Sequence, residues 1–272
     1  MADSSKEQTE TVESLAEGGI LGGYMRQLTE LIEGEEDSQK AAAWFFRQLR
    51  GEQGIAIIKL IFEIERICRE MDSVVNDFAG KDLFFVKVVT LEHLATAMKL
   101  YVISWSTLLD LLACLINEVF DLGIAEKDVK LQLVLNNRHM QPSRIPQIMR
   151  EYEKSLVIKE LKKKRNDLVH RGKIPDVEVE QMLAERNTID SRRYSLLNSL
   201  LKINPISEEE YVKQRSLFQE KLGVQGKQKQ EIWRKHYQQT RMMLSEVGRE
   251  LARERFDLYK EMRPIISSEQ VN

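Results

Sequence analysis

The chain has 272 residues, of which 31% are charged and 42% hydrophobic, and its formal net charge is −2. This composition is typical of globular proteins, and the length is sufficient to bury a sizeable core in one large domain or two small ones. A net charge so close to zero excludes a general attraction to nucleic acid or membrane, so binding of a polyanion would require a local basic patch.

The N-terminal stretch MADSSKEQTETVESLAEG is polar and acidic. It lacks the basic head and apolar segment of a signal peptide, and we expect residues 1–23, including GGILGG, to form a flexible tail. The most apolar region, residues 83–122, is interrupted by charges, and its longest charge-free run covers only residues 100–109. A bilayer span requires about 20 apolar residues. We therefore expect a soluble, cytoplasmic protein without membrane association.

The first half of the chain has the periodicity of helices. Ser38 and Gly51 fit the start and end of one helix, and isoleucines at three- and four-residue spacing predict a second over residues 55–78, ended by Gly80. A third, apolar on most faces, is expected over residues 91–122. The preceding DLFFVKVVT fits either a short extended segment or the first turns of that helix. Residues 129–135 alternate like a strand, but one isolated strand is unstable, so strand is the weaker alternative here.

The second half of the chain is also predicted to be helical. Pro142 and Pro146 precede a long helix over residues 147–170, which Gly172 and Pro175 terminate. Shorter helices are expected over residues 176–186 and 190–201. A capping box formed by Ser207 and Glu210 predicts a helix ending at Gly223, and a last helix over residues 228–262 is expected to stop at Pro264. The predicted fold class is all-α.

The segment KKKRNDLVHRGK, residues 162–173, is the densest basic cluster and contains Arg165, Asn166 and His170. Asn166 and His170 are four residues apart and share a helix face. Arg165 lies about 140° around the axis from His170, because each residue advances an ideal helix by about 100°. The two side chains can meet on one phosphate if the helix loosens near His170. Alternatively, a second copy of the helix supplies the complementary group, which favours a symmetric dimer.

These residue types suit phosphodiester chemistry. His170 can accept or donate a proton near neutral pH, and Arg165 can bind a phosphate through two hydrogen bonds and stabilise the charge that develops on it. Asn166 can orient the imidazole or donate to a phosphate oxygen. The remaining cations of the cluster would attract an RNA backbone; they are Lys162, Lys163, Lys164, Arg171 and Lys173. The scheme requires no metal and no cofactor. A structural alternative is that these cations complement the C-terminal end of a helix dipole.

RNDLVH resembles the R-N-x-x-x-H signature of HEPN domains, which are helical bundles found in prokaryotic toxin and defence proteins. The resemblance implies a HEPN-like core over residues 82–205, with N-terminal helices (24–81) packed on it and additional C-terminal helices (206–272). It further implies a homodimeric, metal-independent endoribonuclease whose catalytic residues are Arg165, Asn166 and His170. Such an enzyme leaves a 2′,3′-cyclic phosphate and a 5′-hydroxyl. An antitoxin or regulatory protein is a further partner that the resemblance suggests.

The sequence also allows other hypotheses about the function of the chain. Some HEPN toxins carry a tyrosine two positions after the histidine, which a partner enzyme modifies, whereas this chain has Gly172. The main alternative function is a non-catalytic HEPN-like module that binds nucleotide, RNA or a protein partner. A third is a structural oligomer that uses the long C-terminal helix.

Several other polar residues were candidates for functional or structural roles. Asp110 lies within an apolar helix and would need a partner if buried, which could be Arg165, His170 or any nearby lysine. We expect His93 to be partly buried, His139 to lie in a solvated loop and His236 to lie on a solvated helix face.

Two further groups of residues are assigned structural roles. Cys68 and Cys114 have no metal-binding spacing and are expected to be reduced, buried thiols. The last helix carries an apolar set expected to pack on the bundle or on a partner helix, consisting of Trp233, Tyr237, Met242, Met243, Leu244, Val247, Leu251 and Phe256.

Overall fold

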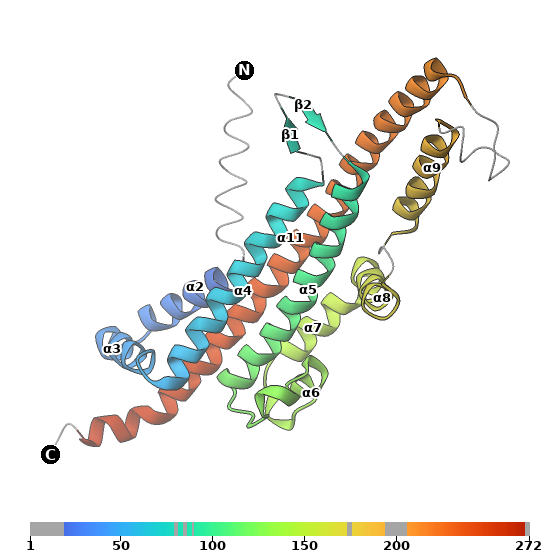
Figure 1. Cartoon of the computed structure of the whole chain (residues 1–272). Coiled ribbons are helices and arrows are strands. Elements are labelled where there is room, and N and C mark those ends of the chain that lie inside the picture. The colour runs from blue at the N-terminus through green and yellow to red at the C-terminus, as the bar shows by residue number, and fades with distance from the viewer. Residues whose placement is uncertain are drawn as a thin grey trace, which may run out of the picture. The chain divides into compact units, whose positions relative to one another are not determined.

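The computed structural model describes residues 19–78, 81–83, 86–88, 90–172, 176–193 and 206–269 (Figure 1). The described chain is all-helical apart from one short antiparallel pair of strands, which confirms the predicted fold class. Strand β1 (Lys81–Leu83) pairs with β2 (Val86–Val88), with Lys81 opposite Val88. Residues 81–83 and 86–88 before the apolar helix are therefore extended, and helix α5 begins only at Leu91.

The chain divides into two compact units, each built from separated segments. Unit 1 comprises Met1–Arg69, Trp105–Ile158 and Tyr237–Asn272, and unit 2 comprises Glu70–Ser104 and Lys159–His236. The divisions fall within four helices, which are α4 (Glu52–Asp77), α5 (Leu91–Val119), α8 (Leu156–Arg171) and α11 (Glu208–Glu269).

Unit 1 contains α2 (Ile20–Glu33), α3 (Ser38–Gln48), α6 (Leu131–Leu135), α7 (Ile145–Lys154) and parts of the four shared helices. Phe45 of α3 stacks on Phe256 of α11, with ring planes 2° apart. Helix α2 approaches α11 closely because both carry glycine at the contact. A Cβ added at Gly248 would lie 2.3 Å from the carbonyl oxygen of Ile20.

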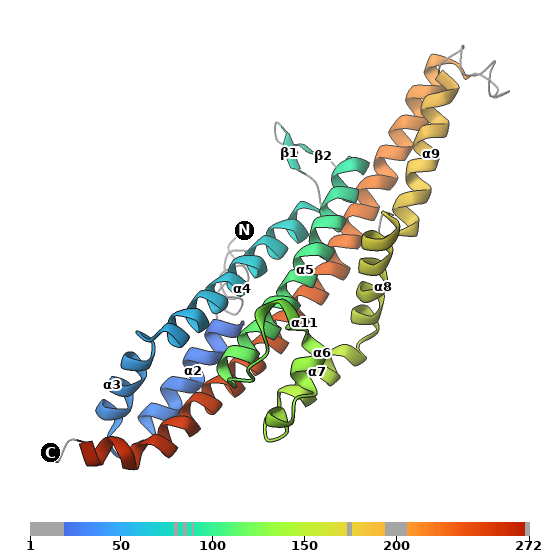
Figure 2. The ribbon, with the colours of Figure 1, turned by 60° about the horizontal axis from the view of Figure 1, so that its bottom comes forward.

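Unit 2 contains the strand pair, α9 (Val177–Arg193) and the remaining parts of α4, α5, α8 and α11. Its core includes a buried cluster in which Trp233 contacts Phe78 and Tyr101 edge to face. Helix α9 lies antiparallel to the first part of α11, as Figures 1 and 2 both show. Paired side chains run in opposite order along the two helices, namely Arg193 with Glu208, Asp190 with Tyr211, Glu185 with Lys221 and Asp176 with Lys229.

The predicted helix over residues 147–170 is two helices, α7 and α8, separated at Ser155, whose ψ of 132° is extended. Ile148 and Tyr152 of α7 are buried, as is Leu161 of α8. At about 100° per residue, one continuous helix would direct Leu161 away from the face that Ile148 and Tyr152 share. The break at Ser155 allows both sets of side chains to be buried.

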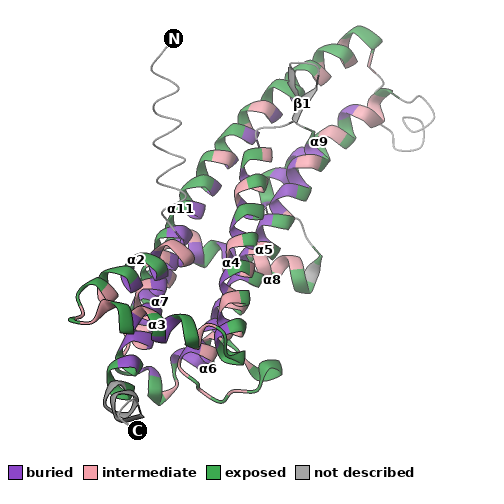
Figure 3. Cartoon of the chain, turned by 90° about the vertical axis from the view of Figure 1, so that its left-hand side faces the viewer, coloured by how far each residue is buried: buried purple, intermediate pink, exposed green. Residues whose placement is uncertain are grey.

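The C-terminal segment was predicted to form two helices, but it forms one, α11, from Glu208 to Glu269. Ser207 does cap it, since its Oγ accepts the backbone N–H of Glu210. The predicted stops at Gly223 and Pro264 are both wrong, and the helical backbone continues through them. A glycine within a helix costs about 1 kcal/mol, which buried side chains on both sides of Gly223 outweigh. Figure 3 shows buried and exposed residues alternating along this helix.

Residues 131–135 are helical, so the strand that their alternating pattern gave as the weaker alternative is absent there. Smaller corrections concern helix ends. Asp37 and not Ser38 caps α3, because its carboxylate accepts the N–H of Lys40. Residues 20–23 of the predicted tail belong to α2. Most of the helix predicted over residues 190–201 lies outside the described residues, and its first four residues belong to α9.

Helix α5 is the one described helix that is long and apolar enough to cross a membrane by length and composition. Half of its most apolar 18-residue window is buried inside the protein. The core helix of a globular protein passes the same test, so this property is weak evidence for a membrane span.

Candidate functional site

The Arg-Asn…His segment lies on the last turns of α8, which remains helical through Arg171. The helix ends at Gly172, whose N–H donates to the carbonyl of Leu168 and whose φ of +62° is left-handed. Glycine adopts this conformation without steric cost, and it is common directly after a helix. No loosening of the helix occurs before His170, so this way of bringing Arg165 and His170 together within one chain is not observed.

The three predicted catalytic residues differ in exposure. Asn166 and His170 are exposed, whereas Arg165 is partly buried. Arg165 lies four residues after the buried Leu161 and therefore on the same side of the helix. The regular helix directs Arg165 about 140° away from His170. One copy of α8 thus presents an amide and an imidazole together on its exposed face, with the guanidinium on another side.

The cations of the basic cluster also differ from one another. Lys163 is exposed, and Lys162 and Lys164 are partly buried. Only the backbone of Arg171 is described, and Lys173 lies outside the described residues. The cluster is therefore not a uniform patch, and the clearest difference is between the neighbours Lys163 and Lys164.

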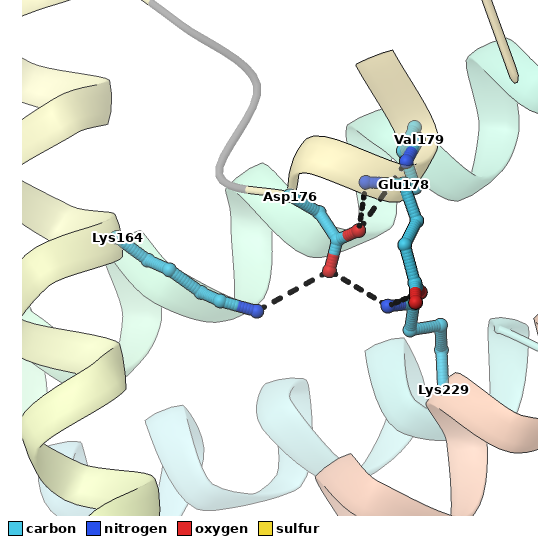
Figure 4. A network of polar contacts seen from close by, with 5 residues as sticks. All are labelled: Lys164, Asp176, Glu178, Val179 and Lys229. Carbon is cyan, nitrogen blue, oxygen red and sulfur yellow. Dashed lines mark hydrogen bonds and ion pairs between the residues drawn. The ribbon is translucent and has the colours of Figure 1, made fainter. Parts of the chain in front are cut away.

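Lys164 belongs to a network of polar contacts that connects three helices (Figure 4). Its ammonium lies 3.3 Å from Oδ2 of Asp176 and 5.4 Å from the ring centre of Trp233. The same carboxylate oxygen accepts a hydrogen bond of 2.8 Å from Lys229, which also pairs with Glu178 at 2.5 Å. Two ammonium groups thus meet two carboxylates, and the charge of Lys164 is compensated inside the fold.

Asp176 is the centre of this network. Its Oδ1 accepts the backbone N–H groups of Glu178 and Val179, so the side chain also caps α9. Burial alone would raise the pKa of the Asp176 carboxyl, but the hydrogen bond from Lys229 and the positive charge of Lys164 outweigh it, and the pKa is lowered. Burial would likewise lower the pKa of Lys229, yet its bonds to Asp176 and Glu178 raise it. Both groups are therefore charged at neutral pH.

Sequence reasoning missed this network. An aspartate directly before an acidic first helical turn is an N-cap signal, and Asp176 followed by Glu178 and Glu180 fits it. That signal identifies the cap of α9. No local pattern indicates that Lys229, 53 residues further on, would reach the same carboxylate.

The remaining candidates differ in exposure. Asp110 is exposed and belongs to unit 1, so it does not require a buried partner. His93 is partly buried, with Nε2 3.0 Å from the carbonyl of Asp77, and His139 is exposed, as predicted.

The prediction for His236 was wrong, because this side chain is 1% exposed. Its Nδ1 lies 2.5 Å from the hydroxyl of Tyr101. Burial lowers the pKa of the imidazole to about 3.

The thiols and most of the apolar residues of the last helix are structural. Burial raises the pKa of the Cys68 thiol to about 12, and Cys114 is partly buried. The predicted apolar set on the last helix is buried except for Met242, which is 66% exposed.

A pocket of about 410 Å³ opens between α9 and α11 in unit 2. Its lining includes the buried Ile189 and Phe218 and the ion pair between Lys221 and Glu185. Within the described part of the chain, no group of three or more His, Cys, Asp or Glu side chains is arranged to hold a metal ion.

A helical chain that carries R-N-x-x-x-H at the end of a helix has the features of the HEPN class. Comparison with protein families agrees: the chain belongs to the Cthe2314-like HEPN family (HEPN_Cthe2314), whose model matches residues 86–266. The match takes in α5, α8, α9 and most of α11. No curated protein and no solved structure matches the chain.

Proposed function

We propose that this protein is a HEPN-type endoribonuclease that acts without a metal ion. The observation that carries the proposal is the exposed pair of Asn166 and His170 on α8, within a family match that includes this helix. An exposed imidazole is accessible to a ribose hydroxyl. The adjacent amide can hold the ring or a phosphate oxygen in position.

The proposed reaction is an intramolecular phosphoryl transfer. His170 accepts the proton of a ribose 2′-hydroxyl, and the 2′-oxygen attacks the adjacent phosphorus. The bond from phosphorus to the 5′-oxygen breaks, and that oxygen takes up a proton. The products are a 2′,3′-cyclic phosphate and a 5′-hydroxyl. Arg165 offsets the negative charge that develops on the non-bridging oxygens of the pentacoordinate phosphorane.

We propose further that the active form is a homodimer, because a regular α8 directs Arg165 and His170 to different sides. A two-fold axis near α8 would place the guanidinium of one subunit beside the imidazole of the other. Each dimer would then contain two composite sites, each with Arg165 from one chain and His170 from its partner.

The first experiment tests the chemistry. Purified full-length protein is incubated with mixed-sequence RNA in EDTA, beside His170→Ala and Arg165→Ala. Loss of one general base or of one charge stabiliser is expected to reduce cleavage by about 10²-fold or more. Products are examined for cyclic phosphate ends. Equal cleavage by all three proteins would refute the assigned roles.

The second experiment tests the composite site. Arg165→Ala and His170→Ala are mixed in equal amounts and allowed to exchange subunits. Half of the dimers become mixed, and each mixed dimer has one complete site, so about a quarter of wild-type activity should return. If Arg165 and His170 act from the same chain, mixing restores nothing.

The non-catalytic alternative has a separate signature, namely RNA or nucleotide binding without cleavage of any RNA tried.

We also propose a cytoplasmic location, which the two free thiols Cys68 and Cys114 support because such thiols persist in reducing compartments. A regulatory partner protein would be sought by its effect on cleavage.

A further inference from the structure

One face of α8 combines exposed cations with the predicted catalytic pair. Lys159, Lys163, Asn166 and His170 recur at spacings of four, three and four residues. At 100° per residue they lie within about 60° of one another around the helix axis. Eleven residue steps of 1.5 Å make this stripe about 17 Å long, so that a bound strand could contact it at more than one phosphate. We call these four residues the α8 stripe.

All four side chains of the α8 stripe are exposed. Neither Lys159 nor Lys163 forms an ion pair with any residue that the structure describes, so both ammonium groups face solvent. Glu160 and Asp167 lie on one flank of the stripe, and Lys162 lies on the other. The exposed lysines of this face thus lie along a line that ends at the imidazole, with the partly buried Lys162 beside it.

Lys164 provides the contrast. It is one residue from Lys163, but its charge is compensated by Asp176, and its side chain is only 27% exposed. It lies about 100° around the helix from Lys163, on the side that faces α9 and α11 (Figure 4). Two adjacent residues of the same type therefore have different environments.

We propose that single-stranded RNA binds along the α8 stripe, with its phosphates over Lys159 and Lys163 and the reactive linkage at His170. This inference deepens the proposed function and rests on it. Lys159 becomes a binding residue that the KKKRNDLVH motif does not include, and Lys164 is removed from the binding set. The partner is recognised by its chain of negative charges, so binding weakens as salt rises.

The test measures binding apart from cleavage. Full-length protein is titrated against fluorescent 2′-O-methyl RNA, which lacks the attacking hydroxyl, at several salt concentrations. Each phosphate contact adds about 0.7 to the slope of log affinity against log salt for a single strand. Lys159→Gln and Lys163→Gln should each lower the slope by about that amount and weaken binding several-fold. Lys164→Gln should leave the slope unchanged, as should Lys235→Gln, an exposed control in the same unit.

The result separates this inference from the proposed function. An unchanged slope for Lys159→Gln, or an equal loss for Lys164→Gln, would overturn the inference even if the protein cleaves RNA. A changed oligomeric state in Lys159→Gln, with the salt slope intact, would overturn it in favour of a protein interface. Lowered slopes in both stripe variants, together with no cleavage of natural RNA, would support the stripe while refuting catalysis. Lys159 and Lys163 are exposed, so their substitution is not expected to affect folding.

Discussion

Asp176 shows how one buried acid can decide what its neighbours do. Its carboxylate caps α9 with one oxygen and holds Lys164 and Lys229 with the other. Lys229 is itself 10% exposed at its side chain, so it depends on Asp176 and Glu178 for compensation of its charge. Removing Asp176 would therefore take away the carboxylate that Lys164 contacts and leave Lys229 with Glu178 alone.

We expect Asp176→Ala to destabilise the protein by about 3 kcal/mol, because it removes a helix cap and leaves a buried ammonium poorly paired. Asp176→Asn keeps a side-chain acceptor for the cap and should cost less. Urea unfolding of the three proteins measures the order. Equal stability of Asp176→Asn and Asp176→Ala would show that the cap contributes nothing.

His236 makes the stability depend on pH. Its pKa of about 3 in the folded protein lies below the ordinary value of 6.5, so the unfolded chain binds more protons between these values. The free energy of unfolding therefore contains the full contribution of neutral His236 above about pH 6.5. This contribution is lost as the pH drops toward 3, by up to roughly 5 kcal/mol. Unfolding at a series of pH values should show this slope.

The control for this slope is His236→Phe, which removes the titrating ring and retains an aromatic beside Trp233. Asp176 also loses stabilising charge in acid, but its lowered pKa places that loss below its usual value of 3.8. The difference between wild type and His236→Phe isolates the histidine. If the difference in unfolding free energy between wild type and His236→Phe does not change between pH 6 and 4, the burial of His236 is contradicted.

The sequence alone was enough to propose candidate reactive residues, but not to predict which distant residues surround them. Arg165, Asn166 and His170 could be named because they form a short local pattern. The solvated position predicted for His236 was wrong because Tyr101, 135 residues earlier, covers it. Lys164 is predicted to bind phosphate because it belongs to the basic cluster. Its acidic partner, Asp176, lies beyond the helix end, so the local pattern does not indicate their contact. Local patterns do not report contacts between distant segments.

At the scale of elements, two glycines of α11 have opposite roles. A Cβ at Gly248 would lie 2.3 Å from the carbonyl oxygen of Ile20, whereas nothing lies within 4 Å of one at Gly223. Gly248 permits the close approach of α2, and Gly223 occupies open space within the same helix.

Gly248→Ala should destabilise the protein by about 2 kcal/mol, since α2 must move away from α11 to accept the methyl group. Gly223→Ala should stabilise it by up to about 1 kcal/mol, because alanine is the better helix former. Chemical unfolding of both variants measures the pair. Destabilisation by Gly223→Ala would mean that the helix is not continuous there.

Most helices could be predicted from periodicity, and the errors have two physical causes. The helix over residues 147–170 was expected to be continuous, but burial of Tyr152 and Leu161 requires the break at Ser155. The stop expected at Gly223 is absent because tertiary packing of the flanking turns outweighs the weak helix propensity of one glycine.

At the scale of the whole molecule, the proposed composite site would link activity to assembly. If the proposed composite site is correct, cleavage per chain should fall on dilution, because only the dimer would contain complete sites. At concentrations well below the dimer dissociation constant, the rate should rise with about the square of the protein concentration. Sedimentation and cleavage measured on one dilution series would test this. A rate strictly proportional to concentration, in samples that sedimentation shows to be monomeric, would argue against the shared site.

The environments of Lys163 and Lys164 have a consequence for large-scale mutagenesis. Substitutions at position 164 should reduce the amount of folded protein in cells, as a weakened native state is degraded faster. Those at position 163 should leave abundance intact and reduce only the output that depends on RNA. A screen that records growth alone would score the two lysines as equivalent, whereas one that also records protein level would separate them.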